Sequence, residues 1–359
     1  MQPAQESKPH VAAAPQKSLA RRATGIFFVA LICFGIIVPR LCLAASADWE
    51  KFLKRHVHMD GRVIDGGAGG ISHSEGQGFG MLLAVHFEDR ETFDRLYKWT
   101  RKNLMIRDDG LLAWRWVPQL EVTDRNNATD GDVLVAWALM RAGARWKSSE
   151  YLDSGITLAR TVREKLIRQT PRGVVLLPGM DGFEQNDSMV LNLSYWVFPA
   201  FAEFRRTEQS PVWTELIQSG YRMLADARFG RWGLPPDWLR QSGTLLALPD
   251  DRPPRYGYDA IRIPLYLLWN NAEADAVLPF RAFSAHFVGA SFFPAWTNLK
   301  DDSVDSHDAV KGVRAIAMLT GTNTSLRNIV LPEMDESQPY YSDALLLLAK
   351  MMLWERTGR

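Results

Sequence analysis

The chain has 359 residues, and its 42 basic and 41 acidic side chains give a net charge of +1. This balance excludes the clustered basic surface that a nucleic-acid-binding protein needs. The only two cysteines are Cys33 and Cys42, so the chain beyond residue 47 has no thiol for a disulfide, a nucleophile or a metal site.

The first 47 residues have the features of a secretory leader. Two arginines at 21–22 precede an apolar run at residues 23–38, and A-S-A at residues 45–47 fits a cleavage site. The run is shorter than the roughly 20 residues of a membrane span. We therefore expect export to the periplasm or the medium. Retention of the leader as an uncleaved anchor is the alternative, because Pro39 and Arg40 separate the run from the cleavage site.

Residues 48–359 are predicted to form a single domain. No Pro/Ser-rich linker or low-complexity stretch divides them, and their length is ample for one large core. They contain 37 basic and 40 acidic residues, for a net charge of −3, and all 13 tryptophans.

The stretch ISHSEGQGFGM, residues 71–81, places Glu75 ahead of glycines at 76, 78 and 80. Each glycine costs a helix about 1 kcal/mol relative to alanine, so these glycines are expected to serve another purpose. They can let a second helix pack closely, or they can form a bare groove floor for a ligand. Ser72 and Glu75 also fit the S-x-x-E capping box, which by itself accounts for the acid.

Apolar residues recur with a helical period in eleven segments, separated by turns rich in Gly, Pro and Asp. The segments are Trp49–Arg55, Ser74–Phe87, Arg90–Asn103, Asp130–Trp146, Tyr151–Gln169, Tyr195–Arg206, Trp213–Ala227, Asp259–Trp269, Leu278–Ala290, Ser306–Thr320 and Tyr340–Glu355. Strand candidates such as RVID (62–65) and GVVLLP (173–178) are few and short. The pattern predicts an all-α protein. No repeat of about 34 residues is visible, which favours a closed double ring of helices, with a groove across one end, over an open solenoid.

Two further acidic sites repeat the position of Glu75 at the start of a predicted helix. Asp130 and Asp132 lie in NNATDGDVLVAWALMRAG, and Asp259 lies in RYGYDAIRIPLYLLW. Helix capping accounts for such acids one by one, and we assign Asp132 to it. If the inner helices of the ring are parallel, however, their N-termini gather at one face and three carboxyls meet in one cleft.

Converging carboxyls suit glycoside hydrolysis. One acid protonates the leaving oxygen while a second group activates water or attacks the sugar carbon. Like charges held close together raise the pKa of one member, which keeps a proton available near neutral pH.

Several tryptophans fall in loop-like stretches, where an indole can stack on the C–H face of a sugar ring. Trp114 and Trp116 lie in LLAWRWVPQ, and Trp232 and Trp238 lie in GRWGLPPDWL. The alternative is that these residues belong to the core, as most tryptophans do.

Three segments, ISHSEGQGFGM, ATDGDVLVAWALMRAGARW and YGYDAIRIPLYLLW, together resemble glycoside hydrolase family 8. The second follows the family signature A-[ST]-D-[AG]-D and a helix ending in A-x-x-x-W. Shorter likenesses occur at GRVID, AWRW, NLSYWVFPAF and GLPPDWL. Within the family, the sequence is most similar to the periplasmic endo-1,4-β-glucanases that accompany bacterial cellulose synthases. The likeness runs from Trp49 to Trp269 and thins beyond.

The resemblance implies an (α/α)6 barrel and hydrolysis with inversion of anomeric configuration. It implies that Glu75 is the general acid, that Asp259 is the general base and that Asp130 holds the distorted sugar. The glycines beside Glu75 are then expected to form the bare groove floor. The resemblance also assigns substrate binding to residues near this centre, namely Trp114, Trp116, Tyr195, Trp232, Trp238, Tyr258 and Arg262.

The sequence therefore predicts endo-acting hydrolysis of cellulose-like β-1,4-glucan, linked to bacterial cellulose biosynthesis. A chitosanase or xylanase of the same family is one alternative. A polysaccharide lyase on a helical toroid and a non-catalytic sugar-binding protein are others. We expect no cofactor and no metal, since no cluster such as H-E-x-x-H is present. The expected partner is a β-1,4-linked polysaccharide. We also expect a functional association with a cellulose synthase complex, and a monomer.

Overall fold

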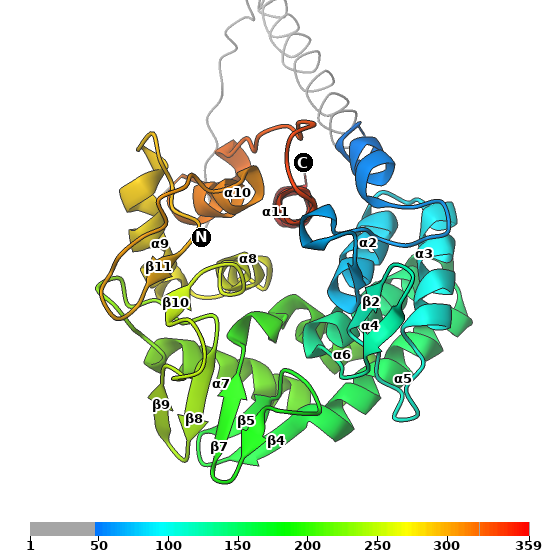
Figure 1. The fold of residues 1–359 in the computed structure, drawn as a ribbon, viewed down its shortest axis with the longest axis horizontal. Coiled ribbons are helices and arrows are strands. Elements are labelled where there is room, and N and C mark those ends of the chain that lie inside the picture. The colour runs from blue at the N-terminus through cyan, green and yellow to red at the C-terminus, as the bar shows by residue number, and fades with distance from the viewer. Residues whose placement is uncertain (1–46, 323, 359) are drawn as a thin grey trace, which may run out of the picture. The chain divides into compact units, whose positions relative to one another are not determined.

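Helices dominate the computed structural model, which describes residues 47–358 except residue 323 (Figure 1). The leader expected at residues 1–47 lies outside the described residues, apart from Ala47. Residues 47–56 are helical. The helices α2 to α11 follow at Ser74–His86, Arg90–Asn103, Thr129–Trp146, Ser149–Leu166, Phe198–Thr207, Val212–Asp226, Arg262–Trp269, Ala274–Val288, Lys311–Thr320 and Tyr340–Thr357.

Each of these helices overlaps a segment predicted from apolar periodicity, and the bounds differ by at most five residues. The predicted start at Asp259 is three residues early, because residues 258–261 form a turn and α8 begins at Arg262.

The strands are short and antiparallel, and they connect the helices at one end. The three-stranded sheet contains β1 (Ser72–His73), β2 (Arg115–Val117) and β3 (Glu121–Asp124). The four-stranded sheet contains β6 (Glu184–Gln185), β7 (Ser188–Leu191), β8 (Leu239–Ser242) and β9 (Leu245–Ala247). Two pairs complete the set: β4 (Ile167–Thr170) with β5 (Gly173–Leu176), and β10 (Arg255–Tyr256) with β11 (Thr297–Asn298). The predicted strand GVVLLP is confirmed as β5, whereas RVID forms only isolated bridges.

The helices form the expected (α/α)6 barrel. In the inner ring, α2 packs on α4, α4 on α6, α6 on α8, α8 on α10, α10 on α11, and α11 back on α2. Outside, α3 packs on α2, α5 on α4, α7 on α6, and α9 on both α8 and α10; Figure 1 shows this outer layer. The inner helix α2 is buried at every position from Gly76 to Val85. By contrast, α3 buries one face only, as expected of an amphipathic outer helix.

Close packing, not a groove floor, explains the glycines after Glu75. A Cβ on Gly78 would lie 2.5 Å from the Cβ of Leu134 on α4, and a Cβ on Gly80 would lie 3.0 Å from Val63. Both glycines are buried. From the other side, Gly131 of α4 lies so close to Ser74 that a Cβ would overlap its side chain. The expectation of a bare floor is therefore wrong for Gly78 and Gly80, because their faces are covered by protein.

No helix within residues 47–358 is both long and apolar enough to cross a bilayer.

Candidate active site

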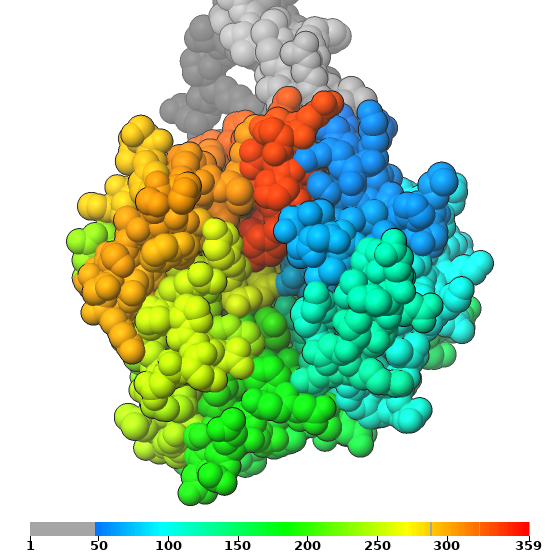
Figure 2. All heavy atoms as spheres, viewed as in Figure 1, coloured from blue at the N-terminus to red at the C-terminus, as the bar shows by residue number. Residues whose placement is uncertain are grey.

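A pocket of about 250 Å³ opens where the N-termini of inner helices meet. Its walls come from α2, α4 and α8, from the 3-10 helix η2 (Leu193–Tyr195) and from the segment around η1 (Gly66–Ala68). The lining residues are Asp65, Ile71, His73, Ser74, Glu75, Trp114, Ala128, Asp130, Tyr195, Asp259 and Arg262. In the space-filling view, the face is hollowed near its middle, where segments far apart in sequence adjoin (Figure 2). The predicted convergence of Glu75, Asp130 and Asp259 is present.

One buried arginine joins the three acids. Arg262, with 2% of its side chain exposed, forms an ion pair with Glu75 through Nη1. The same nitrogen lies 3.3 Å from Oδ2 of Asp130, and Nη2 lies 3.2 Å from Oδ1 of Asp259. A guanidinium suits this place because its planar fork carries five donors and stays charged when buried. The fourth partner is the hydroxyl of Ser194, which accepts from Nη2 at 2.9 Å.

Burial makes two of these carboxyls, those of Asp130 and Asp259, hold protons more tightly. It raises the pKa of Asp130 to about 7, although the N–H of Gly131 and the nearby His73 oppose the rise. Burial, joined by the charges of Asp237 and Asp130, raises the pKa of Asp259 well above its usual range. The Asp259 side chain lines the pocket and is 32% exposed. Glu75 and Asp130 are more enclosed, with 16% and 4% exposed.

A model of the family described as Glycosyl hydrolases family 8 matches residues 29–357. The chain belongs to this family. It is 39% identical over 320 residues to a probable endoglucanase of Novacetimonas hansenii, which covers 88% of this chain and 92% of that protein. An endoglucanase of Cellulomonas uda is 37% identical over 289 residues, with 79% of each chain covered.

Solved structures agree with this membership. The structure of the endo-beta-1,4-glucanase CMCax from Acetobacter xylinum matches with a TM-score of 0.82 at 38% identity, over 86% of this chain and 97% of that one. The endoglucanase Cel10 from Klebsiella pneumoniae, a family 8 glycosyl hydrolase, matches with a TM-score of 0.82 at 34% identity, over 87% and 100%. The protein is thus a glycoside hydrolase, which decides against the lyase and the non-catalytic alternatives.

The acid Glu75 of this family 8 hydrolase is not part of a capping box. The N-cap of α2 is His73, whose Nδ1 accepts the N–H of Gly76 at 3.0 Å. Ser72 instead donates its hydroxyl to the carbonyl of Val63. The capping-box interpretation is therefore wrong, and Glu75 is left to face Arg262.

His73 and Asp65 line the pocket and were not predicted from sequence. Nδ1 of His73 accepts a backbone N–H, so Nε2 carries the proton and points towards Oδ2 of Asp65, 3.7 Å away. The imidazole of His73 beside it lowers the pKa of Asp65. Both residues lie in stretches that carry the family likeness, His73 in ISHSEGQGFGM and Asp65 in GRVID, but nothing in the sequence indicates that the two side chains meet.

Asp132 also differs from its prediction as a helix cap. It is fully buried, and its carboxylate accepts the N–H of Leu112 at 2.8 Å and Nδ2 of Asn127 at 2.7 Å. The N-cap of α4 is Ala128, which makes no side-chain bond. Asp132 therefore joins two loops to α4, because its side chain points into the core and away from the helix end.

The predicted aromatic residues divide into two groups. Trp114 and Tyr195 line the pocket, and Trp238 meets Tyr195 edge to face at 6.1 Å between ring centres. Tyr258, at 41% exposure, is next to Asp259 in sequence. Two tryptophans lie apart from the pocket lining: Trp116 packs on Trp99 and Arg62, and Trp232 packs on Phe283 and His286.

Two wider hollows, of about 470 and 620 Å³, lie between α3 and α5 on the outside of the barrel. They share Tyr97, Arg101 and Glu150, and neither brings together carboxyls with raised pKa values. Size alone therefore does not mark the active site. Within the described residues, no group of three or more His, Cys, Asp or Glu side chains is arranged to hold a metal ion.

Proposed function

We propose that this family 8 hydrolase is an endo-acting β-1,4-glucanase that inverts the anomeric configuration. The observation that carries the proposal is the meeting of Glu75, Asp130 and Asp259 on the buried Arg262, within one open pocket.

Glu75 acts as the general acid and protonates the glycosidic oxygen as the bond to it breaks. Asp259 acts as the general base: it takes a proton from a water molecule, which attacks the anomeric carbon from the opposite face of the sugar. Asp259 must be ionised for this step, and its raised pKa makes it a stronger base. Asp130, the most enclosed of the three, accepts hydrogen bonds from the sugar at the cleavage point.

The positive charge of Arg262 lets three acids share the pocket. Without it, carboxylates so close together would take up protons, because like charges disfavour ionisation. The guanidinium also fixes the direction of each carboxylate, which keeps the acid and the base aligned with the bond.

The substrate class follows from the relatives, which are named endoglucanases, and from the aromatic wall of the pocket. Trp114 donates Nε1–H to Asp124 at 2.7 Å, which fixes the indole at the pocket edge. A fixed indole offers a flat surface to the C–H face of a glucosyl ring. We further propose export through the leader, action as a monomer, and functional association with a cellulose synthase complex; the last rests on the sequence resemblance alone.

Two substitutions test the mechanism. We expect Glu75→Gln and Asp259→Asn each to lower the kcat on carboxymethylcellulose by at least about 100-fold, since each removes a proton-transfer group. The matched control is Glu91→Gln, which changes an exposed acid in the first turn of α3. Full activity in either pocket variant would contradict the mechanism.

Two product measurements complete the test. NMR of the first products should show the α-anomer, as inversion of a β-linkage requires. Faster release of reducing sugar from chitosan or xylan than from cellulose would overturn the substrate assignment.

A further inference from the structure

A buried carboxylate outside the pocket lining supports Asp259 from behind. Asp237, 2% exposed, lies in the segment GLPPDWL, 22 residues before Asp259. Its Oδ1 accepts three backbone N–H groups, from Gly257 at 2.9 Å, Asp259 at 3.2 Å and Ala260 at 2.9 Å. Its Oδ2 accepts Nε–H of Arg255 at 3.0 Å.

These bonds fix the turn that carries Asp259 into the pocket. The N-cap of α8, Ile261, provides no side-chain bond. Asp237, from a distant part of the chain, instead accepts N–H groups of the turn that precedes α8. Gly257 lies close to this carboxylate, since a Cβ at this position would lie 3.1 Å from Oδ2 of Asp237 and would crowd it.

We propose that Asp237 is the positioning residue of Asp259, holding the turn beneath it and placing a fixed negative charge behind it. This inference rests on the proposed role of Asp259 as general base. Burial raises the pKa of Asp237 too, against the N–H groups and Arg255, which lower it. Every polar contact of Asp237 is with an N–H donor, however, so a proton on Asp237 would displace one of them. A proton shared between the two carboxyls therefore resides on Asp259.

The charge of Asp237 has a definite effect on the reaction. Burial is the largest cause of the raised pKa of Asp259, and Asp237 is the next. Arg255 acts in the opposite direction and lowers that pKa. Since the base must be ionised, its apparent pKa sets the pH below which kcat/KM falls. Asp237 keeps this acid limb at a higher pH, and Arg255 keeps it at a lower pH.

Other groups face Asp259 from the elements around it, and the variants below leave them in place. They are Arg262 of α8, Asp130 of α4, Tyr195 of η2, Tyr341 of α11 and Asn192, together with Glu75 through its ion pair with Arg262. Because these groups interact, the acid limb of the pH profile reports an apparent pKa of Asp259 and its neighbours together. A single substitution among them shifts that apparent pKa.

Two substitutions of opposite sign test the inference. Asp237→Asn keeps the size of the side chain and removes its negative charge, so we expect the acid limb of kcat/KM to move about one pH unit lower. Arg255→Gln keeps a donor for Asp237 and removes a positive charge, so the limb should move higher. We also expect Asp237→Asn to lower kcat by roughly tenfold with little change in KM, since a weaker and less well-held base slows the chemical step.

Asp343→Asn is the matched control. It also removes a buried carboxylate paired with an arginine, but it lies in the contact of α11 with residues 47–56. It should lower stability and leave the acid limb unmoved. A purely structural role for Asp237 would give the same pattern as this control.

The result that overturns the inference is an acid limb that stays in place, or moves in the same direction, in both Asp237→Asn and Arg255→Gln. If Asp237→Asn fails to fold, Arg255→Gln decides, because Arg255 is partly exposed and its loss leaves the core intact. Full activity of Asp259→Asn is a separate outcome: it overturns the proposed function, and this inference with it.

Discussion

At the scale of the residue, two acids on one helix turn have different tasks. Asp130 faces the pocket and Arg262, whereas Asp132 faces the core, where it accepts from Leu112 and Asn127. Burial raises the pKa of each to about 7. The A-T-D-G-D motif therefore combines a carboxyl that lines the pocket with a carboxyl that joins loops in the core, two positions apart.

The raised pKa values predict how stability depends on pH. In the unfolded chain an aspartate titrates near 3.9, so between about pH 4 and pH 7 each of these aspartates binds more protons in the folded protein than in the unfolded chain. Burial lowers the pKa of His86, which acts in the opposite direction below about pH 6.5, but it is one group against several aspartates. Stability should therefore fall as pH rises through this window. Acids whose pKa is lowered, such as Asp65 and Asp109, lose their contribution only as pH falls below about 4, outside this window.

Urea unfolding at pH 5, 6, 7 and 8 measures this slope. Asp132→Asn removes one of the aspartates whose pKa is raised in the folded protein, so its slope should be shallower than that of the wild type. An unfolding free energy that rises from pH 5 to pH 7 would contradict the assignment.

At the scale of the element, the pair α2–α4 sets the distance between the acid and the aspartate that faces it. The two helices approach closely because glycines meet side chains on both sides, Gly78 against Leu134 and Gly131 against Ser74. Glu75 and Asp130 stand in the first turns of this pair. If Glu75 is the general acid, as proposed, the glycines after it support catalysis indirectly, through helix packing.

Gly78→Ala tests this coupling. The added methyl would lie 2.5 Å from a Cβ on α4, so the helices must separate. We expect a loss of about 1–3 kcal/mol of stability from overpacking, with a several-fold lower kcat as the carboxyls move apart. Gly289→Ala is the control, since nothing lies within 4 Å of a Cβ there. Thermal melting and carboxymethylcellulose assays of both variants test this prediction. Equal stability and equal kcat in Gly78→Ala and Gly289→Ala would contradict the coupling.

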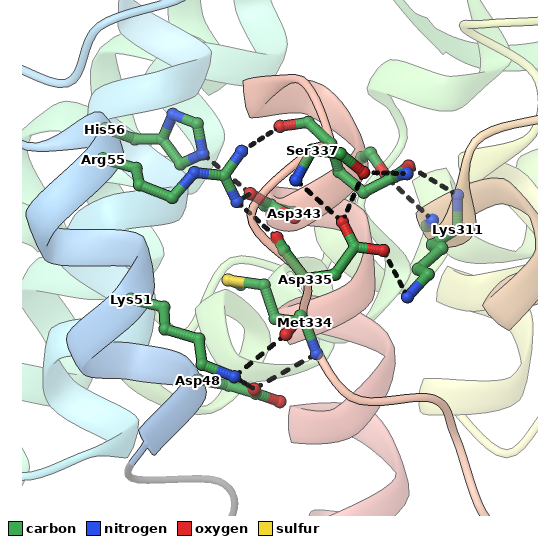
Figure 3. Close-up of polar contacts among 12 residues, drawn as sticks. Asp48, Lys51, Arg55, His56, Lys311, Met334, Asp335, Ser337 and Asp343 are labelled. Carbon is green, nitrogen blue, oxygen red and sulfur yellow. Dashed lines mark hydrogen bonds and ion pairs between the residues drawn. The ribbon is translucent and has the colours of Figure 1, made fainter.

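At the scale of the whole molecule, a set of polar contacts closes the ring. They join the helix at residues 47–56 to α11 and to the segment before it (Figure 3). Arg55 donates to the carbonyl of Asp335 and to Oδ2 of Asp343, both at 2.7 Å, and His56 lies 2.8 Å from the same oxygen. Asp48 accepts the N–H of Met334 at 3.2 Å and pairs with Lys350. The same helix α11 carries Tyr341, whose hydroxyl donates to the carbonyl of Tyr258 beside the pocket.

Arg55→Met should therefore destabilise the domain without altering its chemistry. It leaves the fully buried Asp343 without its arginine, which costs about 3–5 kcal/mol. Arg90→Ala breaks the exposed pair with Asp94, at 3.9 Å, and should cost about 1 kcal/mol or less. Urea unfolding compares the two losses, and kcat of the folded Arg55→Met protein should stay within about twofold of the wild type. A loss equal to that of Arg90→Ala would contradict a role in ring closure.

The sequence by itself determined the helices, the barrel and the three acids. Apolar periodicity marks each helix because every inner helix must bury its surface, and the acids stand in short motifs at helix starts. Only the tertiary structure decided which side chains meet. Arg262 joins acids from two helices and a turn, His73 and not Ser72 caps α2, and Asp237 accepts the N–H of Asp259, 22 residues further along the chain. Such contacts depend on the direction of each side chain and on the way the ring of helices closes. A periodic pattern of apolar residues predicts neither of these.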